Sequence, residues 1–402
     1  MDLHQRYSYV TKSDYDSVAG PDWPLFDEFV FHRAVPDFVY KEVDSMLARP
    51  SKFDHSAFCV LPFYGVEYPQ NTACCLMPHG TNRHSVQTEM LDNIRPKACN
   101  KCWQLEDAGY KSDRHIKNET LEFLFQRSLV DILDDCQQKK TDIVHYKIDT
   151  NNVCNAACMT CSSHFSSTWA KIERKNGIIP KPIRQLKARH VDPKINYKTA
   201  KAIIFRGGEP FLSDTNFYIL EQLLANNNDH CFVSFVTNGS SDLSVRQKNI
   251  LAQFSNVNFC CSIDGIGSVF DYLRYPLHFE NVQDNIKIWQ DLGIAVSANF
   301  TVSNLNLLYY AETVEWFEKN KINFALNPVY NPSYFAITSL PKSVKQKILQ
   351  LNPSIPFDIV NSHNQNDDKN FEQFKKEVQK QDKWKKTQLR EYLPALADLV
   401  DL

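Results

Sequence analysis

The chain has 402 residues, of which 43% are hydrophobic and 23% charged, values typical of a globular protein with two or three folding units or one enlarged barrel. The 45 Lys and Arg residues nearly balance the 47 Asp and Glu residues, so no overall basic field favours a nucleic-acid partner. The apolar runs fall short of the roughly 18 residues that a membrane helix needs, and the first residues, MDLHQRYSYV, form no apolar signal-peptide core. The composition therefore predicts a cytoplasmic protein without a membrane or nucleic-acid partner.

The N-terminal part of the chain divides into two regions. Residues 1–50 are rich in aromatic side chains and interrupted by prolines, which predicts an N-terminal extension. Residues 51–140 hold six of the twelve cysteines and end in NETLEFLFQRSLVDILDD, whose apolar spacing predicts an amphipathic exit helix. Grouped cysteines in an intracellular chain indicate metal or cluster binding more than disulfides, because that compartment keeps thiols reduced. We expect a small cysteine-rich domain here.

Residues 141–335 contain short β-rich runs that alternate with helical stretches. The runs are VHYKI, KAIIF, FVSFV, NVNFCCSI, IAVSANFTV and NFALNPV. Such alternation predicts an α/β fold of βα units around a parallel sheet, and six strands fit a partial (β/α)6 barrel of the TIM type. Residues 336–402 have helical spacing with many charges, so we predict a C-terminal helical region whose long charged helix is solvated.

A CxxxCxxC motif follows the first predicted strand of this region, in the segment IDTNNVCNAACMTC. Its thiolates, Cys154, Cys158 and Cys161, can each bind one iron of a [4Fe-4S] cluster, whereas a cluster that only carries electrons normally has four cysteine ligands. The open iron can chelate the amino and carboxylate groups of a small molecule and bring a sulfonium within reach of one-electron reduction. Cleavage of that C–S bond would give a 5′-deoxyadenosyl radical, which abstracts hydrogen from a substrate. The motif alone is also compatible with structural zinc.

Three further motifs follow successive predicted strands. They are RGGEP at 206–210, TNG at 237–239 and SIDG at 262–265. Their order and their position at strand ends, together with CxxxCxxC, resemble the radical S-adenosylmethionine (radical SAM) superfamily. The resemblance implies S-adenosyl-L-methionine as the cofactor beside the cluster. The residues that it implies for binding this cofactor are Gly207, Gly208, Glu209, Pro210, Thr237, Asn238, Ser262, Asp264, Arg274 and Asn299.

The resemblance also implies a role for several of these residues. Two adjacent glycines let backbone groups come close to a ligand, and Glu209 suits the ammonium group of the methionine part. The TNG segment is expected near the ribose and Arg274 at the cofactor carboxylate. Asn299 is a weaker candidate for a ribose or adenine contact.

A second candidate metal site precedes the barrel. The proposed ligands are Cys59, Cys74, Cys99 and Cys102, the last two in a CxxC motif. Adjacent cysteines point in different directions, so we expect only one of Cys74 and Cys75 to bind, and we favour Cys74. A zinc site that uses His79 or His84 explains the same pattern equally well on chemical grounds.

The run of FCxLPF, paired cysteines, CxxCxxxExxGxxSxR and a radical domain resembles the twitch and SPASM radical SAM proteins, which carry an auxiliary iron–sulfur cluster. The resemblance covers roughly residues 55–340 and implies an auxiliary [4Fe-4S] cluster in residues 51–140. In well-known members the auxiliary domain follows the barrel, whereas here every candidate ligand precedes it. Four thiolates favour a fully ligated cluster that relays electrons or stabilises the domain. Glu106, Ser112 and Arg114 either face the active site or pair locally.

Relatives with auxiliary clusters act largely on peptides and proteins. By this analogy we expect a ribosomally made precursor peptide as the substrate, modified by crosslinking, epimerisation, oxidation or excision of a tyramine unit. A small leader-binding partner protein and an external electron donor would assist. The alternatives are a radical oxidoreductase that acts on a sugar or nucleoside, and a non-catalytic binding module stabilised by zinc.

Overall fold

The computed structural model describes residues 56–74, 76–107, 112–178, 194–329, 331–355 and 367–402. The predicted N-terminal extension and Cys75 lie outside the described residues.

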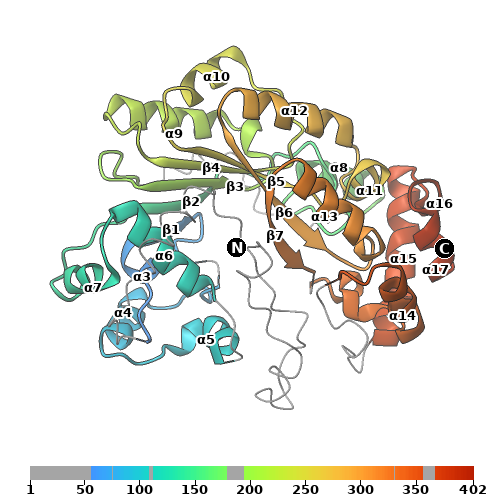
Figure 1. Ribbon diagram of the computed structural model, residues 1–402, viewed down its shortest axis with the longest axis horizontal. Helices are drawn as coiled ribbons and strands as arrows, with labels where there is room; N and C mark the ends of the chain where they lie inside the picture. The colour runs from blue at the N-terminus through green and yellow to red at the C-terminus, as the bar shows by residue number, and fades with distance from the viewer. Residues whose placement is uncertain (1–55, 75, 108–111, 179–193, 330, 356–366) are drawn as a thin grey trace.

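A seven-stranded parallel sheet forms the centre of the molecule, and its strands follow one another in chain order (Figure 1). The strands are β1 (Gly65–Tyr68), β2 (His145–Asp149), β3 (Ala202–Arg206), β4 (Phe232–Thr237), β5 (Val257–Ser262), β6 (Ala295–Val302) and β7 (Asn323–Pro328). Each strand pairs in parallel with the next, which places β1 and β7 at the two edges of the sheet. The predicted α/β class and all six predicted strands are confirmed.

Strand β1 is an addition that the sequence pattern did not predict, since its four residues, GVEY, show no clear strand signal. Glu67 on β1 faces Lys147 on β2, and the Lys147 Nζ and Glu67 Oε1 atoms lie 2.8 Å apart in a buried ion pair. The carboxylate also pairs with Arg206 on β3 at 3.2 Å. The cysteine-rich segment is thus joined to the sheet by a strand, and the domain boundary near residue 140 stays a prediction.

Helices cover the sheet between the strands. They are α8 (Ser167–Lys175), α9 (Asp214–Ala225), α10 (Val245–Leu251), α11 (Gly267–Leu273), α12 (Phe279–Asp291) and α13 (Tyr310–Lys319). The N-terminal helices, which gather beside β1 in Figure 1, are α3 (Leu61–Tyr64), α4 (Arg83–Leu91), α5 (Asn100–Asp107), α6 (Asp113–Phe125) and α7 (Leu129–Gln137). The C-terminal helices are α14 (Lys342–Leu351), α15 (Asp367–Lys385), α16 (Leu389–Tyr392) and α17 (Pro394–Val400).

The predicted exit helix is two helices, α6 and α7, and the expectation of one continuous stretch is wrong. Gln126 ends α6 with a left-handed backbone at a φ of 53°, which a continuing right-handed helix does not allow. Ser128 then caps α7, because its side chain accepts a hydrogen bond from the backbone of Asp131.

Two hydrophobic cores correspond to the two cysteine regions. In the sheet, Phe205, Phe235 and Phe259 point from neighbouring strands to one face, where they pack against Phe211 and Trp289. A separate core lies in the cysteine-rich segment, and its members include Phe58, Leu61, Met90, Trp103, Leu121 and Cys136. Because the segment has a core of its own, its cysteines are held by packing that does not depend on the sheet's interior.

Helix α15 differs from the predicted solvated helix. Phe374, Val378, Gln381 and Lys385 repeat at helical spacing and are buried, while the neighbouring Lys383 is exposed. The high charge of the segment hides this stripe, because its last two members are polar residues. The helix therefore packs one face against the body of the protein.

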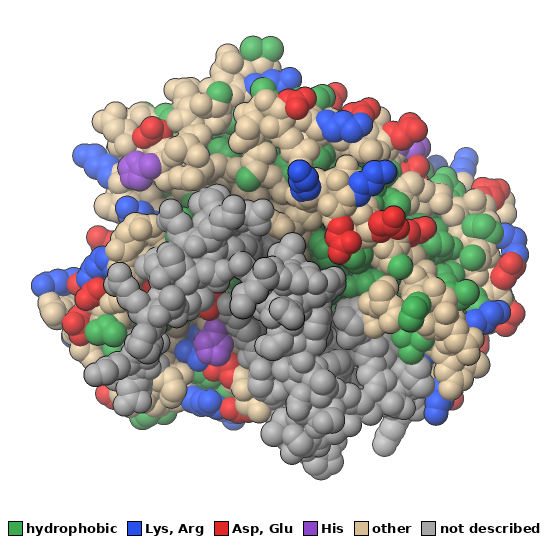
Figure 2. Space-filling model, in the orientation of Figure 1, with side chains coloured by type: hydrophobic (Ala, Val, Ile, Leu, Met, Phe, Trp, Pro, Cys, Tyr) green, Lys and Arg blue, Asp and Glu red, His purple; other side chains and the backbone are tan. Residues whose placement is uncertain are grey.

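The described surface carries both signs of charge, as expected from the near-zero net charge. In Figure 2, Lys and Arg side chains are interspersed with Asp and Glu side chains. None of the helices in the described ranges has the length and apolar character that a membrane span requires.

Candidate functional site

The CxxxCxxC loop follows β2 and is fixed on one side by helix α8. Ser167 and Thr168 hydrogen-bond to the backbone of Cys154, with the Ser167 Oγ 3.1 Å from the Cys154 nitrogen and the Thr168 Oγ1 2.7 Å from its oxygen. The Trp169 indole donates to the Cys158 carbonyl at 2.8 Å. The first turn of α8 therefore sets the positions of two of the three cysteines.

The end of α11 and the residues just after it also hold the loop. The backbone N–H of Ala157 donates to the Tyr275 carbonyl at 2.6 Å, and that of Met159 donates to the Leu273 carbonyl at 2.8 Å. The two donors are two residues apart in the loop, and their acceptors lie at the last residue of α11 and two residues beyond it. The loop is thus an ordered part of the fold.

The three thiols of the loop lie within electrostatic range of one another. Burial raises the pKa of Cys154 to about 11 and that of Cys161 to about 12. Burial also raises the pKa of Cys158, and the nearby Arg274 guanidinium opposes that shift. Without a metal the three thiols stay protonated at neutral pH, so binding a metal or cluster would release protons.

Arg274 lies directly beside the loop. Its Nη1 is 3.8 Å from the Cys158 Sγ, and its Nη2 is 2.8 Å from the Asp264 Oδ1 in a nearly buried ion pair. Its buried Nε has no hydrogen-bond partner among the described residues. An unpartnered buried N–H is costly, so this donor is suited to a ligand with an acceptor atom at that point.

The RGGEP segment contacts the loop through its backbone. Gly208 donates to the Asn151 carbonyl at 3.0 Å, and Glu209 donates to the Val153 carbonyl at 2.7 Å. A Cβ at Gly208 would lie 2.2 Å from the Val153 oxygen, and a Cβ at Gly207 would lie 2.5 Å from the Asn151 oxygen. The glycines therefore permit close approach of this segment to the cysteine loop. From the sequence we had expected them to permit close approach to a ligand.

Glu209 connects the second and third motifs. Its carboxylate accepts hydrogen bonds from the Thr237 Oγ1 at 2.8 Å, the Asn238 N–H at 2.8 Å and the Phe211 N–H at 3.2 Å. Burial raises the pKa of Glu209 to about 7, against the lowering effect of these donors. A carboxylate has about four acceptor positions, so one remains for a further donor.

The TNG motif reaches the loop by side-chain amides. Asn238 Nδ2 donates to Asn155 Oδ1 at 2.7 Å, and Asn155 Nδ2 donates to Ser240 Oγ at 2.8 Å. Asn155 lies between the first two cysteines, and neither it nor Ser240 was predicted as a site residue. A polar residue inside a cysteine motif was the available signal for Asn155.

The remaining predicted cofactor residues lie farther along the strand ends. Ser262 and Asn299 are register partners on β5 and β6, and the Asn327 amide donates to Asn299 Oδ1 at 3.3 Å. Pro210 is buried and begins the short 3-10 helix Pro210–Leu212. Glu209 contacts the cysteine loop directly, whereas Ser262 and Asn299 lie on strands β5 and β6.

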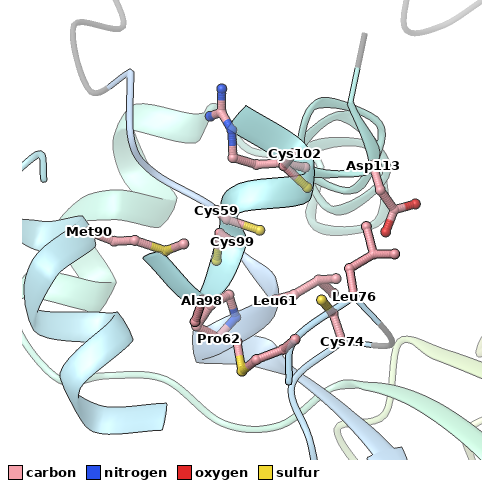
Figure 3. Close-up of a pocket in the computed structure, with 12 residues that line it drawn as sticks. Cys59, Leu61, Pro62, Cys74, Leu76, Met90, Ala98, Cys99, Cys102 and Asp113 are labelled. Carbon is pink, nitrogen blue, oxygen red and sulfur yellow. The ribbon is translucent and has the colours of Figure 1, made fainter. Parts of the chain in front are cut away.

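The second predicted site is a pocket lined by four cysteines. They are Cys59, Cys74, Cys99 and Cys102, and Figure 3 shows their sulfur atoms around one space. The pocket is partly open to solvent. The cysteines come from three separate places in the segment, because Cys99 and Cys102 share one CxxC motif, so their convergence depends on its tertiary fold.

Burial governs the chemistry of this pocket. It raises the pKa of Cys99 to about 12 and that of Cys102 to about 11, and it raises the pKa of Cys59 well above its usual range. His79 and His84, the possible zinc ligands, are exposed and do not line the pocket. In the described ranges no three His, Cys, Asp or Glu side chains are already arranged around one metal-ion position.

Residues of the CxxCxxxExxGxxSxR motif support Cys59. Arg114 donates to the Phe58 carbonyl at 2.7 Å and forms a buried ion pair with Glu106 at 2.6 Å. Ser112 also donates to the Glu106 carboxylate, and the Arg114 guanidinium lies 5.0 Å from the Trp103 ring. Of the two roles left open, local pairing is the one that these contacts show.

Asn118 on α6 is a support that sequence reasoning missed. Its Oδ1 accepts from the Val60 N–H at 2.9 Å, and its Nδ2 donates to the Phe58 carbonyl at 3.0 Å. These bonds hold the backbone on both sides of Cys59. A lone asparagine in an amphipathic helix carries no signal of such a role.

No protein-family model and no curated protein matches the chain. Among solved structures, it is similar to "Native anSMEcpe with bound AdoMet", with 17% identity, 52% of this chain and 59% of that chain covered, and a TM-score of 0.35. It is also similar to Streptococcus suis SuiB bound to its precursor peptide SuiA, with 15% identity, 64% and 57% covered, and a TM-score of 0.35. The chain thus spans under two thirds of the length of these proteins, and likeness at this level does not establish a shared family.

Replacing Glu106 by Ala should lower the free energy of unfolding by about 3 kcal/mol or more, because Arg114 is left as a buried, unpaired charge. Asp107→Ala is the matched control on the same helix. It breaks an exposed ion pair with Arg95, whose loss should change stability by less than about 1 kcal/mol. Urea unfolding followed by circular dichroism measures both values. Equal losses in the two variants would contradict the structural role of Glu106.

Glu209 should make the stability of the iron-free protein depend on pH. The pKa of Glu209 is about 7 in the folded protein, against the usual value of 4.5 that applies to the unfolded chain. Between pH 4.5 and 7 the folded protein therefore keeps a proton that the unfolded chain has lost. Stability should therefore fall as pH rises through this window, by an amount on the order of 3 kcal/mol.

Glu209→Gln should flatten this dependence, whereas Glu280→Gln, at an exposed glutamate, should leave it intact. Unfolding curves between pH 4.5 and 7.5 provide the comparison. A Glu209→Gln variant with the pH slope of the parent protein would show that Glu209 ionises normally.

Proposed function

We propose that the chain is a radical SAM enzyme in which Cys154, Cys158 and Cys161 hold a [4Fe-4S] cluster. The observation that carries this proposal is the convergence of the strand-end motifs on one cysteine loop, through Gly208 and Asn238. When bound, such a cluster supplies the electron that cleaves S-adenosyl-L-methionine to the 5′-deoxyadenosyl radical, which takes hydrogen from the substrate.

The residues around the loop fit this cofactor. Arg274 offers its unpartnered Nε to an acceptor such as the cofactor carboxylate, and Asp264 holds the guanidinium in place. Glu209 has an acceptor position for the cofactor amino group, and it fixes the turn that contains Asn238. Glu209 and Asp264 are buried and Arg274 is nearly so, so they would bind the cofactor in a setting that largely excludes water.

We infer that the four-cysteine pocket holds an auxiliary iron–sulfur cluster. Four thiolates from four positions can ligate every iron of a cubane, which favours electron relay or structural stabilisation over substrate binding at an open iron. The exposed positions of both candidate histidines weigh against a mixed Cys–His zinc site.

We propose a ribosomally made precursor peptide as the substrate. The support is the resemblance to auxiliary-cluster enzymes, together with a polar sheet face opposite the aromatic core. On that face Asn258 hydrogen-bonds to Ser234 and Ser297, and Arg206 pairs with Asp149. Crosslinking, epimerisation, oxidation and tyramine excision all remain within this proposal, with a leader-binding partner protein and an external reductant. A sugar or nucleoside is the alternative substrate.

Replacing Cys154, Cys158 and Cys161 together by Ala should abolish formation of 5′-deoxyadenosine and halve the iron content. Anaerobic reconstitution of the parent protein should give about eight irons per chain, as two cubanes require, and the triple variant about four. The reciprocal control is Cys99→Ala with Cys102→Ala, which should lose the other four irons and still cleave the cofactor. Zinc without iron in the parent protein, or cofactor cleavage by the triple variant, would refute the radical enzyme.

Incubation with reductant and S-adenosyl-L-methionine should change the mass of a precursor peptide. Peptides encoded near the gene are the test set, with the triple cysteine variant as the control for chemistry that needs no cluster. High-resolution mass spectrometry distinguishes two kinds of mass change. Crosslinking or oxidation removes hydrogen, whereas excision removes the larger mass of a tyramine unit. Epimerisation, which leaves mass unchanged, shows as deuterium incorporation from heavy water. Turnover confined to a sugar or nucleoside would replace the peptide proposal by its alternative.

A further inference from the structure

The last turn of helix α15 places a buried lysine against the CxxxCxxC loop. The Lys385 Nζ lies 3.2 Å from the Met159 Sδ and donates to the Gln381 Oε1 at 2.9 Å. It also lies 4.6 Å from the centroid of the Trp169 ring. Only 3% of Lys385 is exposed, so the charge does not reach bulk water.

Gln381, one turn earlier on α15, ties the helix to the loop. Its Nε2 donates to the Met159 carbonyl at 3.1 Å, and its Oε1 receives the Lys385 hydrogen bond. Met159 is the residue directly after Cys158, and Trp169 donates to the Cys158 carbonyl. The lysine is therefore held by the same residues that set the position of the loop.

The direct partners of Lys385 are neutral. They are an amide oxygen, a thioether and an aromatic face, each of which attracts a cation weakly compared with a carboxylate. Burial lowers the pKa of Lys385 to about 7; the Asp382 carboxylate opposes this shift, as thiolates at Cys158 and Cys161 would. Burying the Lys385 charge costs desolvation free energy, and an anionic group on the loop itself would offset that cost best.

We propose that Lys385 is a positioning residue that holds a positive charge beside the cluster of Cys158 and Cys161 and thereby raises its reduction potential. The inference rests on the proposed function, because it requires a cluster on this loop. Reduction adds one negative charge to the cluster, so a nearby buried cation stabilises the reduced state more than the oxidised state. The cation would favour the state from which the cofactor is cleaved.

Lys385→Met tests the charge while keeping a long side chain, and Lys385→Arg restores it. Lys383→Met is the matched control, since Lys383 is an exposed lysine on the same turn. The measurement is an anaerobic redox titration, followed by the electron paramagnetic resonance signal that responds to S-adenosyl-L-methionine. Iron content and thermal unfolding of each variant show whether the cluster and the fold are retained.

We expect Lys385→Met to keep its cluster and to lower the ratio of reduced to oxidised cluster about tenfold at a fixed potential, a shift of about 59 mV. Lys385→Arg and Lys383→Met should titrate like the parent protein. An unchanged potential in Lys385→Met, or a lowered one in Lys385→Arg, would overturn the role of the charge. If Lys385→Met does not fold, Lys385→Gln provides the same comparison. A parent protein without a cofactor-responsive signal would instead refute the proposed function.

Discussion

The site depends on one backbone contact, in which the end of β3 lies against the cysteine loop that follows β2. The N–H groups of Gly208 and Glu209 donate to loop carbonyls. The approach is so close that a Cβ at Gly207 or Gly208 would collide with the loop backbone. Through Glu209 the contact extends to the end of β4, whose Asn238 returns to the loop at Asn155. Three neighbouring strands thereby fix one loop, which is the arrangement that parallel sheets offer at their carboxyl ends.

Strand β1 fixes the position of the four-cysteine pocket relative to the CxxxCxxC loop. Cys59 precedes this strand and Cys74 follows it, while the loop with Cys154 follows the paired strand β2. The buried pair of Glu67 and Lys147 joins the two strands and would be left as an isolated charge if they separated. The pairing therefore holds the two cysteine sites on neighbouring strands of one sheet.

The sequence was most informative where a local pattern of residue types is enough to predict the structure. Short β-rich runs between helical stretches predicted six strands, and the motifs that follow these strands indicated where a site would form. It failed where position depends on contacts distant in the chain. β1 is held by an ion pair with a strand far along the sequence, and Asn118 is notable only because it meets the backbone on both sides of Cys59. Even the roles of Gly207 and Gly208 required coordinates, since a glycine does not reveal what approaches it.

Charge is distributed around the cysteine loop in a way that anticipates an anionic occupant. Arg274, which is nearly buried, and Lys385, which is buried, lie near Cys158, and of the two only Arg274 forms an ion pair, with Asp264. The thiols themselves are neutral at pH 7 when no metal is bound, so Lys385 then faces groups that do not compensate its charge. Such an arrangement reduces the stability of the empty protein and stabilises a loop that carries negative charge. Loading the loop would therefore strengthen the contacts of α8, α11 and α15 together, which couples occupancy of the site to the packing of the C-terminal helices.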